Sequence, residues 1–309
     1  MSIVVCGSLA FNTIMEVNKK FHFNDSSAHL NAYFSIPDMR RGFSGCAGNI
    51  SYTLKLLDCQ PLPVATVGSD FHTYNKWLKQ CKIKRDYIKT IKHSYTAQSF
   101  VTKDMADNRI TTYHTGAMAF SDSNSLLDLN LTANLAVIAP ESETGMLQHA
   151  RELNQYNIPF LFYPKQTLER FEEGQLLELI EIANWMIVTE NQLQTLQNQL
   201  GLDAEKLKQY LDALIIQESN QTCLIYADNI CHQIPAARFK KKNDFTGCKD
   251  AFCAGILYSL EHDIDWETGG RIANLMTGIV AEYHGAQTHH FNLTQFKQLF
   301  RKVFDYRLM

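Results

Sequence analysis

Short apolar runs recur along most of the chain, and they lack the alternation of polar and apolar residues that marks a strand with one wet face. A uniform apolar run is typical of a strand that helices cover on both sides. The runs that predict such strands are residues 3–6, 63–67, 136–139, 159–163, 185–188 and 222–226. We therefore expect a sheet buried between two layers of helices.

Between these runs, apolar residues recur three or four positions apart, which is the spacing of an amphipathic helix. The predicted helices are residues 49–57, 72–80, 145–155, 175–182, 192–200 and 204–217, and helical spacing dominates again over 250–283 and 293–304. Alternating strands and helices indicate a doubly wound, mostly parallel α/β sheet with right-handed crossovers. No repeat or linker interrupts the pattern, so residues 1–309 are expected to form one domain.

Residues 12–42 and 95–115 break this pattern, because both stretches are rich in aromatic and β-branched residues. In the second stretch, Asp107-Asn108 lies between two such runs and favours a hairpin. We expect these segments to form a small antiparallel β lid. It would cover a cleft at the carboxyl ends of the parallel strands, where open α/β sheets bind ligands.

Composition and charge narrow the classes of partner. A net charge of −3 and a pI near 6.4 give no basic field that would attract nucleic acid, and the one basic cluster, at 238–242, is short. No apolar stretch approaches the ~20 residues that span a bilayer, and no signal-peptide pattern is evident. The eight cysteines lack zinc or redox spacing, which favours reduced thiols. We expect a cytoplasmic protein that binds neither nucleic acid nor membrane and has no metal site built from clustered ligands.

The segment Asp244-Phe-Thr-Gly-Cys-Lys-Asp250 carries the strongest chemical signal. Thr246-Gly247 indicates a turn, and an apolar helix starts at about Cys248 to Asp250. A helix N-terminus has unpaired amides and a positive dipole end, so it binds anions. A carboxylate beside those amides suits phosphoryl transfer, because it can accept the proton of an attacking hydroxyl. Taken alone, the segment fits an ordinary helix start with an acidic first turn better.

A glycine-rich stretch, Arg41-Gly-Phe-Ser-Gly-Cys-Ala-Gly-Asn-Ile50, precedes a predicted helix. Its glycines permit a ligand to approach the backbone closely, and Asn49 can donate and accept hydrogen bonds there. A flexible loop capped by Asn is the alternative. The first strand is not followed by G-x-G-x-x-G, and no P-loop motif occurs, which disfavours a Rossmann dehydrogenase.

Together these segments resemble the ribokinase-like, or pfkB, family of carbohydrate and nucleoside kinases, from Ile3 to about Gln287. The stretch 42–49, with Pro63-Val-Ala-Thr-Val-Gly-Ser-Asp70, is similar to the N-terminal signature of that family. The stretch 244–255 is similar to its C-terminal signature, D-x-T-G-x-x-D. The resemblance implies a kinase that uses ATP and Mg²⁺ to phosphorylate a primary hydroxyl of an adenosine-type nucleoside or a sugar. It also implies a lid over the acceptor, which serves some members as a homodimer interface.

The same resemblance assigns roles to individual residues. Asp250 would be the general base that deprotonates the acceptor. The residues that would face the phosphates and the nucleotide are Gly247, Cys248 and Lys249, as an anion hole, with Thr246 and Asn274. The residues that would face the acceptor are Asn12, Gly45, Asn49 and Phe100. For Phe100, stacking on a base and packing in the core are equally consistent with an aromatic side chain.

Several positions depart from the family pattern. The departures are Asn12 for Asp, Ser44-Gly45 for a double glycine, Thr189-Glu-Asn-Gln192 without a final carboxylate, a 226–230 turn without glycine, and Lys249 for glycine. Lys249 would obstruct the phosphate site, pair with Asp250 and weaken it as a base, or neutralise the transferring phosphate. A left-handed backbone at Lys249 would add roughly 1–2 kcal/mol of strain. The alternative function is therefore a catalytically impaired member that binds a ligand or partner.

Overall fold

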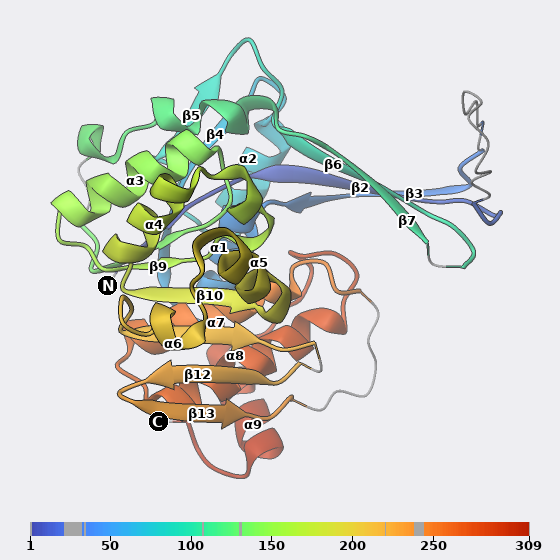
Figure 1. Cartoon of the computed structure of the whole chain (residues 1–309). Coiled ribbons are helices and arrows are strands. Elements are labelled where there is room, and N and C mark those ends of the chain that lie inside the picture. The colour runs from blue at the N-terminus through green and yellow to red at the C-terminus, as the bar shows by residue number, and fades with distance from the viewer. Residues whose placement is uncertain are drawn as a thin grey trace.

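A nine-stranded sheet forms the centre of the computed structural model, which describes residues 2–21, 33, 35–106, 108–129, 132–219, 221–237 and 244–308 (Figure 1). Its strands are β1 (Ser2–Cys6), β4 (Gln60–Gly68), β5 (Ile88–Ile91), β8 (Leu135–Ile138), β9 (Phe160–Phe162), β10 (Trp185–Thr189), β11 (Ala213–Gln217), β12 (Cys223–Ala227) and β13 (Ile230–Ile234). Their order is β13-β12-β11-β10-β9-β8-β1-β4-β5. The strands from β11 to β5 run parallel, and β12 and β13 add antiparallel at one edge. The predicted mostly parallel sheet is confirmed.

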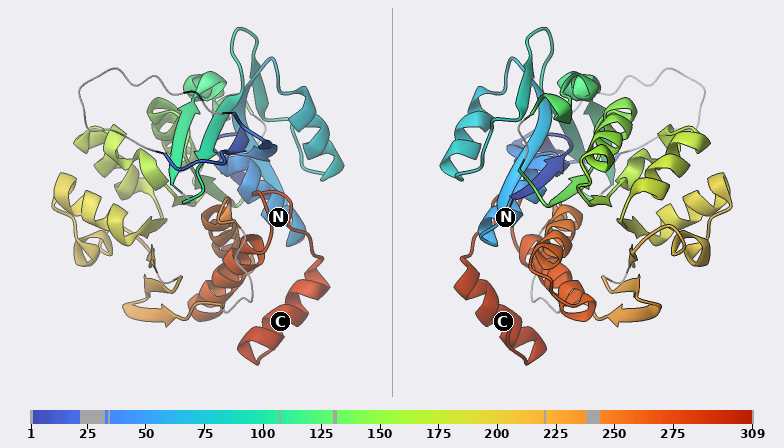
Figure 2. Two further views of the ribbon diagram at one scale, coloured as in Figure 1. Left: turned by 90° about the vertical axis from the view of Figure 1, so that its right-hand side faces the viewer. Right: turned by 90° about the vertical axis from the view of Figure 1, so that its left-hand side faces the viewer.

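Helices cover both faces of this sheet, as the uniform apolar strands predicted (Figure 2). One face packs against α1 (Cys46–Leu56), α7 (Cys248–Glu261), α8 (Trp266–Ala281) and α9 (Leu293–Phe304). The other face packs against α3 (Glu143–Gln155), α4 (Glu173–Ile182), α5 (Glu190–Leu200) and α6 (Ala204–Leu207). In β1, Ile3 belongs to the first core and Val4 to the second. None of the helices in the described ranges is long and apolar enough to cross a membrane.

A second sheet projects from the upper half of the molecule as a long ribbon (Figure 1). It consists of β3 (Asp38–Ser44), β2 (Ala10–Glu16), β6 (Ala97–Lys103) and β7 (Arg109–His114), in the order β3-β2-β6-β7. The pairs β2–β3 and β6–β7 are antiparallel, whereas β2 and β6 run parallel. The two segments predicted as a lid therefore supply these four strands. Two predictions, the basic cluster at 238–242 and Asp107 of the hairpin, lie wholly or partly outside the described residues.

The predicted helix at 204–217 is wrong in its second half. Helix α6 ends at Leu207, and 213–217 form β11, which is paired with β10 and β12. Its Ala-Leu-Ile-Ile run is buried on both faces, an environment that overrides weak local helical spacing. The turn between β12 and β13 forms without glycine. Asp228 and Asn229 adopt the left-handed φ values of 52° and 60° that it requires, and these two residue types tolerate such values in hairpins.

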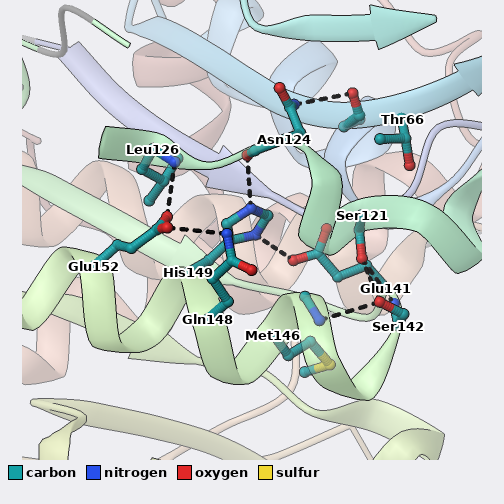
Figure 3. A network of polar contacts seen from close by, with 12 residues as sticks. Thr66, Ser121, Asn124, Leu126, Glu141, Ser142, Met146, Gln148, His149 and Glu152 are labelled. Atoms are coloured by element: carbon teal, nitrogen blue, oxygen red, sulfur yellow. Dashed lines mark hydrogen bonds and ion pairs between the residues drawn. The ribbon is translucent and has the colours of Figure 1, made fainter. Parts of the chain in front are cut away.

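A buried polar network fixes the carboxyl end of β8 onto α3 (Figure 3). His149 is fully buried, with Nδ1 2.6 Å from Glu141 Oε1 and Nε2 3.0 Å from the carbonyl oxygen of Asn124. Both partners accept, so the ring donates from both nitrogens as an imidazolium. Burial alone would lower the pKa of His149, but the charge of Glu141 raises it well above its ordinary value. The chain that follows β8 is thereby held beside Ser8, whose amide donates to Pro140 at 3.0 Å.

Candidate active site

The carboxyl ends of β9, β10 and β11 and the start of α7 surround a cavity of about 660 Å³. This is the edge of an open α/β sheet where ligands bind, and the volume suits a ligand of nucleotide size. The residues of its wall that matter below are Lys165, Glu190, Glu218, Gly247, Cys248, Lys249, Asp250 and Asn274. The predicted anion hole and Asn274 therefore lie together. Thr246 does not line this cavity, because its amide and hydroxyl both donate to Asp244 Oδ1, at 3.0 and 2.7 Å.

The anion-hole segment makes a sharp turn into α7. Gly247 is the N-cap and has a left-handed φ of 83°, and a Cβ there would lie 2.6 Å from Ala286 Cβ. The Cys248 amide donates to the carbonyl of Phe245 at 3.2 Å, whereas the next amides belong to a first helical turn that offers no intrahelical acceptor. Lys249 has helical dihedrals, so the left-handed strain considered for it does not arise.

Asp250 is almost fully buried in the first turn of α7, where the helix dipole favours a carboxylate. Its Oδ2 accepts a hydrogen bond from Asn49 Nδ2 at 2.7 Å. Its Oδ1 accepts from Lys165 Nζ at 2.9 Å and from the Tyr163 hydroxyl at 3.4 Å. The ion pair of Asp250 is thus made with Lys165, and not with Lys249, which was one of the three alternatives for that lysine.

Lys165 was missed by the sequence analysis, although it follows a predicted strand at the ligand-binding edge. Its φ of 50° lies in the left-handed region, which costs a non-glycine residue roughly 1–2 kcal/mol. Its carbonyl accepts from Gln192 Nε2, while Gln192 Oε1 accepts from the Thr189 amide at 2.8 Å. The amide at 192 therefore has a function that a carboxylate could not perform, because a carboxylate cannot donate to a carbonyl.

Two lysines, Lys165 and Lys249, line this cavity. Burial would lower the pKa of Lys165, but the charge of Asp250 raises it. Burial lowers the pKa of Lys249, and the nearby charge of Lys165 lowers it further. The wall of the cavity therefore combines Asp250 with two ammonium groups and the amides of a helix N-terminus.

A second cavity, of about 470 Å³, lies between the lid and the loop that follows α8. Asn12 lines it, and its Oδ1 is buried with no hydrogen-bond partner among the described residues. Such an unpaired buried acceptor is costly unless a ligand or water supplies a donor. Gly45 does not line this cavity; it caps α1 with a φ of 92°, and a Cβ there would lie 2.4 Å from the Ser8 carbonyl oxygen.

Strand register separates Phe100 from Asn12. Asn12 is paired with Ser99, and Ser99 with Tyr113, so these three side chains share one lid face. Phe100 is one position further along β6 and points to the opposite face, where it is about one-third exposed (36%). The aromatic side chain on the same face as Asn12 is Tyr113, which the sequence analysis did not single out.

Residues 3–291 match the model of the pfkB family carbohydrate kinases. The chain belongs to the pfkB family. A nucleoside kinase from Burkholderia thailandensis, solved in complex with inosine, is 34% identical over 99% of both chains, with a TM-score of 0.90. A nucleoside kinase from Methanocaldococcus jannaschii is 25% identical over 97% of this chain and 98% of that one, with a TM-score of 0.88. A ribokinase from Thermotoga maritima, at 16% identity, 97% and 99% coverage and a TM-score of 0.78, shares the fold.

These findings confirm the ribokinase-like fold, and they make this pfkB protein an ATP-dependent kinase of the nucleoside and sugar kinase group. The acidic residues allow one inference about Mg²⁺. Within the described ranges no three acidic, His or Cys side chains cluster as a metal site, yet Glu190 and Glu218 both line the cavity of about 660 Å³. Mg²⁺ normally uses one or two carboxylates together with substrate phosphates, so these two residues fit it.

Proposed function

We propose that this pfkB kinase transfers the γ-phosphoryl group of ATP to a primary hydroxyl of a nucleoside, with Asp250 as the general base. The observation that carries the proposal is the position of Asp250. It is buried at the N-terminus of α7, its side chain is fixed by Asn49, and it opens onto the cavity that the anion-hole segment lines. An oriented carboxylate beside oriented amides meets the needs of phosphoryl transfer, which depends on positioning and charge stabilisation.

In the proposed reaction, Asp250 accepts a proton while cationic groups and amides stabilise the transferring phosphoryl group. The acceptor hydroxyl gives its proton to Asp250 as its oxygen bonds to the γ-phosphorus, and ADP leaves with the electrons of the broken P–O bond. Protonation removes the charge of Asp250 and weakens its ion pair with Lys165, so this ammonium can turn to the phosphoryl oxygens. Lys249 and the first-turn amides of α7 stabilise the same charge. Mg²⁺, held by Glu190 and Glu218, would neutralise the polyphosphate when bound.

The nucleoside is preferred over a free sugar because the relative that is 34% identical across the full chain was solved with inosine. Asn12, Gly45 and Asn49 are proposed to contact the ribose, with Asn12 supplying the unpaired Oδ1. Thr246 is proposed to act through Asp244, and Asn274 to contact the nucleotide. Phe100 stays a proposed acceptor contact that would need the lid to present its other face.

The competing function is a ligand-binding module with impaired catalysis. The specific observation in its favour is the Lys165–Asp250 ion pair, because a cation on the base opposes uptake of a proton. The two functions differ in turnover rather than in binding.

The test is a panel of purine and pyrimidine nucleosides and free sugars, each incubated with the protein, ATP and Mg²⁺ while ADP release is recorded. We expect at least one nucleoside to be turned over, faster than ribose or a hexose. Calorimetry on the same panel separates the alternatives. Saturable nucleoside binding without ADP release would overturn the kinase proposal and support the binding module.

We also propose that the protein forms a homodimer through the lid. We further propose that it is cytoplasmic and that the chain forms a single domain. The lid exposes several large apolar side chains, namely Met39, Phe100, Ile110 and Tyr113, and exposed apolar surface of this kind is common at protein interfaces. All eight cysteines are free, which suits a reducing compartment. Sedimentation of the wild type and of Ile110→Lys tests the dimer: we expect the variant to sediment as a monomer.

A further inference from the structure

A continuous chain of buried hydrogen bonds connects Asp250 to an aromatic cluster on α2 (His72–Gln80). Asn49 Nδ2 donates to Asp250 at 2.7 Å, and Gln287 Nε2 donates to Asn49 Oδ1 at 3.0 Å. Trp77 Nε1 donates to Gln287 Oε1 at 3.0 Å. Asn49 and Gln287 are each only 3% exposed. The Asn49 and Gln287 part of the chain therefore lies in the interior, where an unmade hydrogen bond is costly, and its Trp77 end is half-buried at the wall of the second cavity.

Trp77 fixes which atom of each amide in this chain donates and which accepts. An indole N–H can only donate, so the atom of Gln287 that faces Trp77 must be the carbonyl oxygen. The Gln287 amide nitrogen then faces Asn49, which forces Asn49 to present its oxygen to Gln287 and its own nitrogen to Asp250. A reversed Asn49 amide would place an oxygen against the Asp250 carboxylate, and two acceptors repel each other.

A side branch ties the chain to the hinge of the lid. Gln287 Nε2 also donates to the Tyr74 hydroxyl at 2.6 Å, and that hydroxyl donates to the carbonyl of Ser44 at 2.8 Å. Ser44 is the last residue of β3, where the lid joins α1. The branch needs glycine at 48, because a Cβ there would lie 1.9 Å from the Tyr74 hydroxyl oxygen.

We propose that Trp77, Gln287 and Tyr74 are positioning residues for the general base. They fix the orientation of the Asn49 amide, which in turn orients Asp250, and Tyr74 couples that orientation to the lid hinge. This inference rests on the proposed function of Asp250. Trp77 and Gln287 also line the second cavity with Asn12, but in this proposal all three residues act on Asp250 through Asn49.

The decisive comparison uses a matched pair of substitutions, Tyr74→Phe and Tyr52→Phe. Both tyrosines belong to the same aromatic cluster, and each donates its hydroxyl to a backbone carbonyl, Tyr74 to Ser44 and Tyr52 to His289 at 2.7 Å. Among the described residues, Tyr52 contacts the chain to Asp250 only by ring stacking on Trp77. We expect Tyr74→Phe to lower kcat about 10-fold with the KM for ATP unchanged, since small misplacements of catalytic groups are costly. Tyr52→Phe should leave kcat within about two-fold of wild type.

Gln287→Glu probes the direction of the chain. A carboxylate cannot donate to Asn49 Oδ1, so the Asn49 amide should reverse and present its oxygen to Asp250. We expect kcat to fall roughly 10- to 100-fold and the acid limb of the pH–rate profile to move to higher pH, because a carboxylate that faces an acceptor holds its proton more tightly. Equal effects of Tyr74→Phe and Tyr52→Phe, or an unshifted acid limb in Gln287→Glu, would overturn the proposal.

A measurement without catalysis keeps this proposal separate from the proposed function. The free energy of unfolding is measured for Gln287→Leu, Asp250→Asn and the double variant. Residues in one hydrogen-bond network show non-additive losses, whereas independent sites add. Non-additive losses support the chain even if the wild type phosphorylates no nucleoside, and additive losses contradict it whether or not the enzyme is active.

Discussion

The two oxygens of Asp250 lie in different surroundings. Oδ2 faces a neutral chain of amides and an indole, in which Asn49 and Gln287 are almost completely buried. Oδ1 faces the cavity of about 660 Å³ and a cation, Lys165, whose side chain is 20% exposed. Neutral groups can be buried cheaply once all their hydrogen bonds are made, whereas a buried charge remains expensive. Under the proposed function, the buried side would orient Asp250 as the base and the open side would neutralise the charge of the phosphates.

Both sides meet at the Asp250 carboxylate, so we expect its loss to lower kcat more than any other substitution. Asp250→Asn keeps the shape of the side chain but cannot accept the proton of the acceptor, so we expect kcat to fall about 10²- to 10⁴-fold. Nucleoside affinity, measured by calorimetry, should change little. A variant as fast as wild type would show that Asp250 is not the base.

Lys165→Met removes the ion pair on the open side of Asp250 and leaves the hydrogen bonds of the buried side in place. We expect a drop of about 10² in kcat, the typical cost of one charge-stabilising donor, with little change in the binding of ATP or ADP, since the ammonium is proposed to turn to the phosphoryl oxygens only after Asp250 is protonated. Lys208→Met is the matched control, because Lys208 lies over the ring of Tyr226 and does not line the cavity. An unchanged kcat in Lys165→Met would contradict this role.

A further test concerns His289, which packs against Tyr52, the ring that stacks on Trp77. His289 is fully buried beside Thr53, with Nε2 3.3 Å from its hydroxyl oxygen. Burial, helped by the charge of His290, lowers the pKa of His289 to about 4. An unfolded His titrates near 6.5, so the unfolded chain takes up this proton first and stability is lost as pH falls below about 6.5. Between pH 7 and 5 the loss from this group should be on the order of 2 kcal/mol.

Urea unfolding of wild type and His289→Leu at these two pH values measures that contribution. We expect the variant to lose less stability than wild type between pH 7 and 5. The same pH dependence in both proteins would mean that His289 is not held neutral by the fold.

Lys249 should have the smallest effect, because its side chain is more exposed than that of Lys165 and the ion pair of Asp250 is made with Lys165. If it assists the phosphates, Lys249→Met should weaken ATP binding by about 3- to 10-fold, as read by calorimetry. A higher rate in Lys249→Met would instead mean that the lysine obstructs the phosphate site.

The sequence predicts six of the nine strands of the main sheet and most helices, because buried strands have a recognisable uniform pattern, but it does not predict the edge strands β5 and β13. It fails at 213–217, where an apolar run suits a helix and a strand equally until its neighbours β10 and β12 are known. The segment 244–250 could also be identified as a candidate site from the sequence, since the turn, the helix start and the carboxylate are adjacent in the chain.

The partners of Asp250 could not be predicted in the same way. Lys165 and Asp250 are 85 positions apart, and Trp77 and Gln287 are 210 apart. Their contacts depend on a left-handed backbone at Lys165 and on the packing of α2 against the loop after α8, and neither leaves a local pattern. The register that separates Phe100 from Asn12 is likewise a property of the paired strands.

The most direct test of the account compares a nucleoside with its 5′-deoxy analogue, which lacks only the primary hydroxyl. Protein, ATP and Mg²⁺ are incubated with each compound, and ADP and the phosphorylated nucleoside are quantified together by mass spectrometry. The account predicts equal amounts of ADP and 5′-monophosphate from the nucleoside and no acceptor-dependent ADP from the analogue. Equal ADP release with both compounds, or none with any nucleoside, would contradict it.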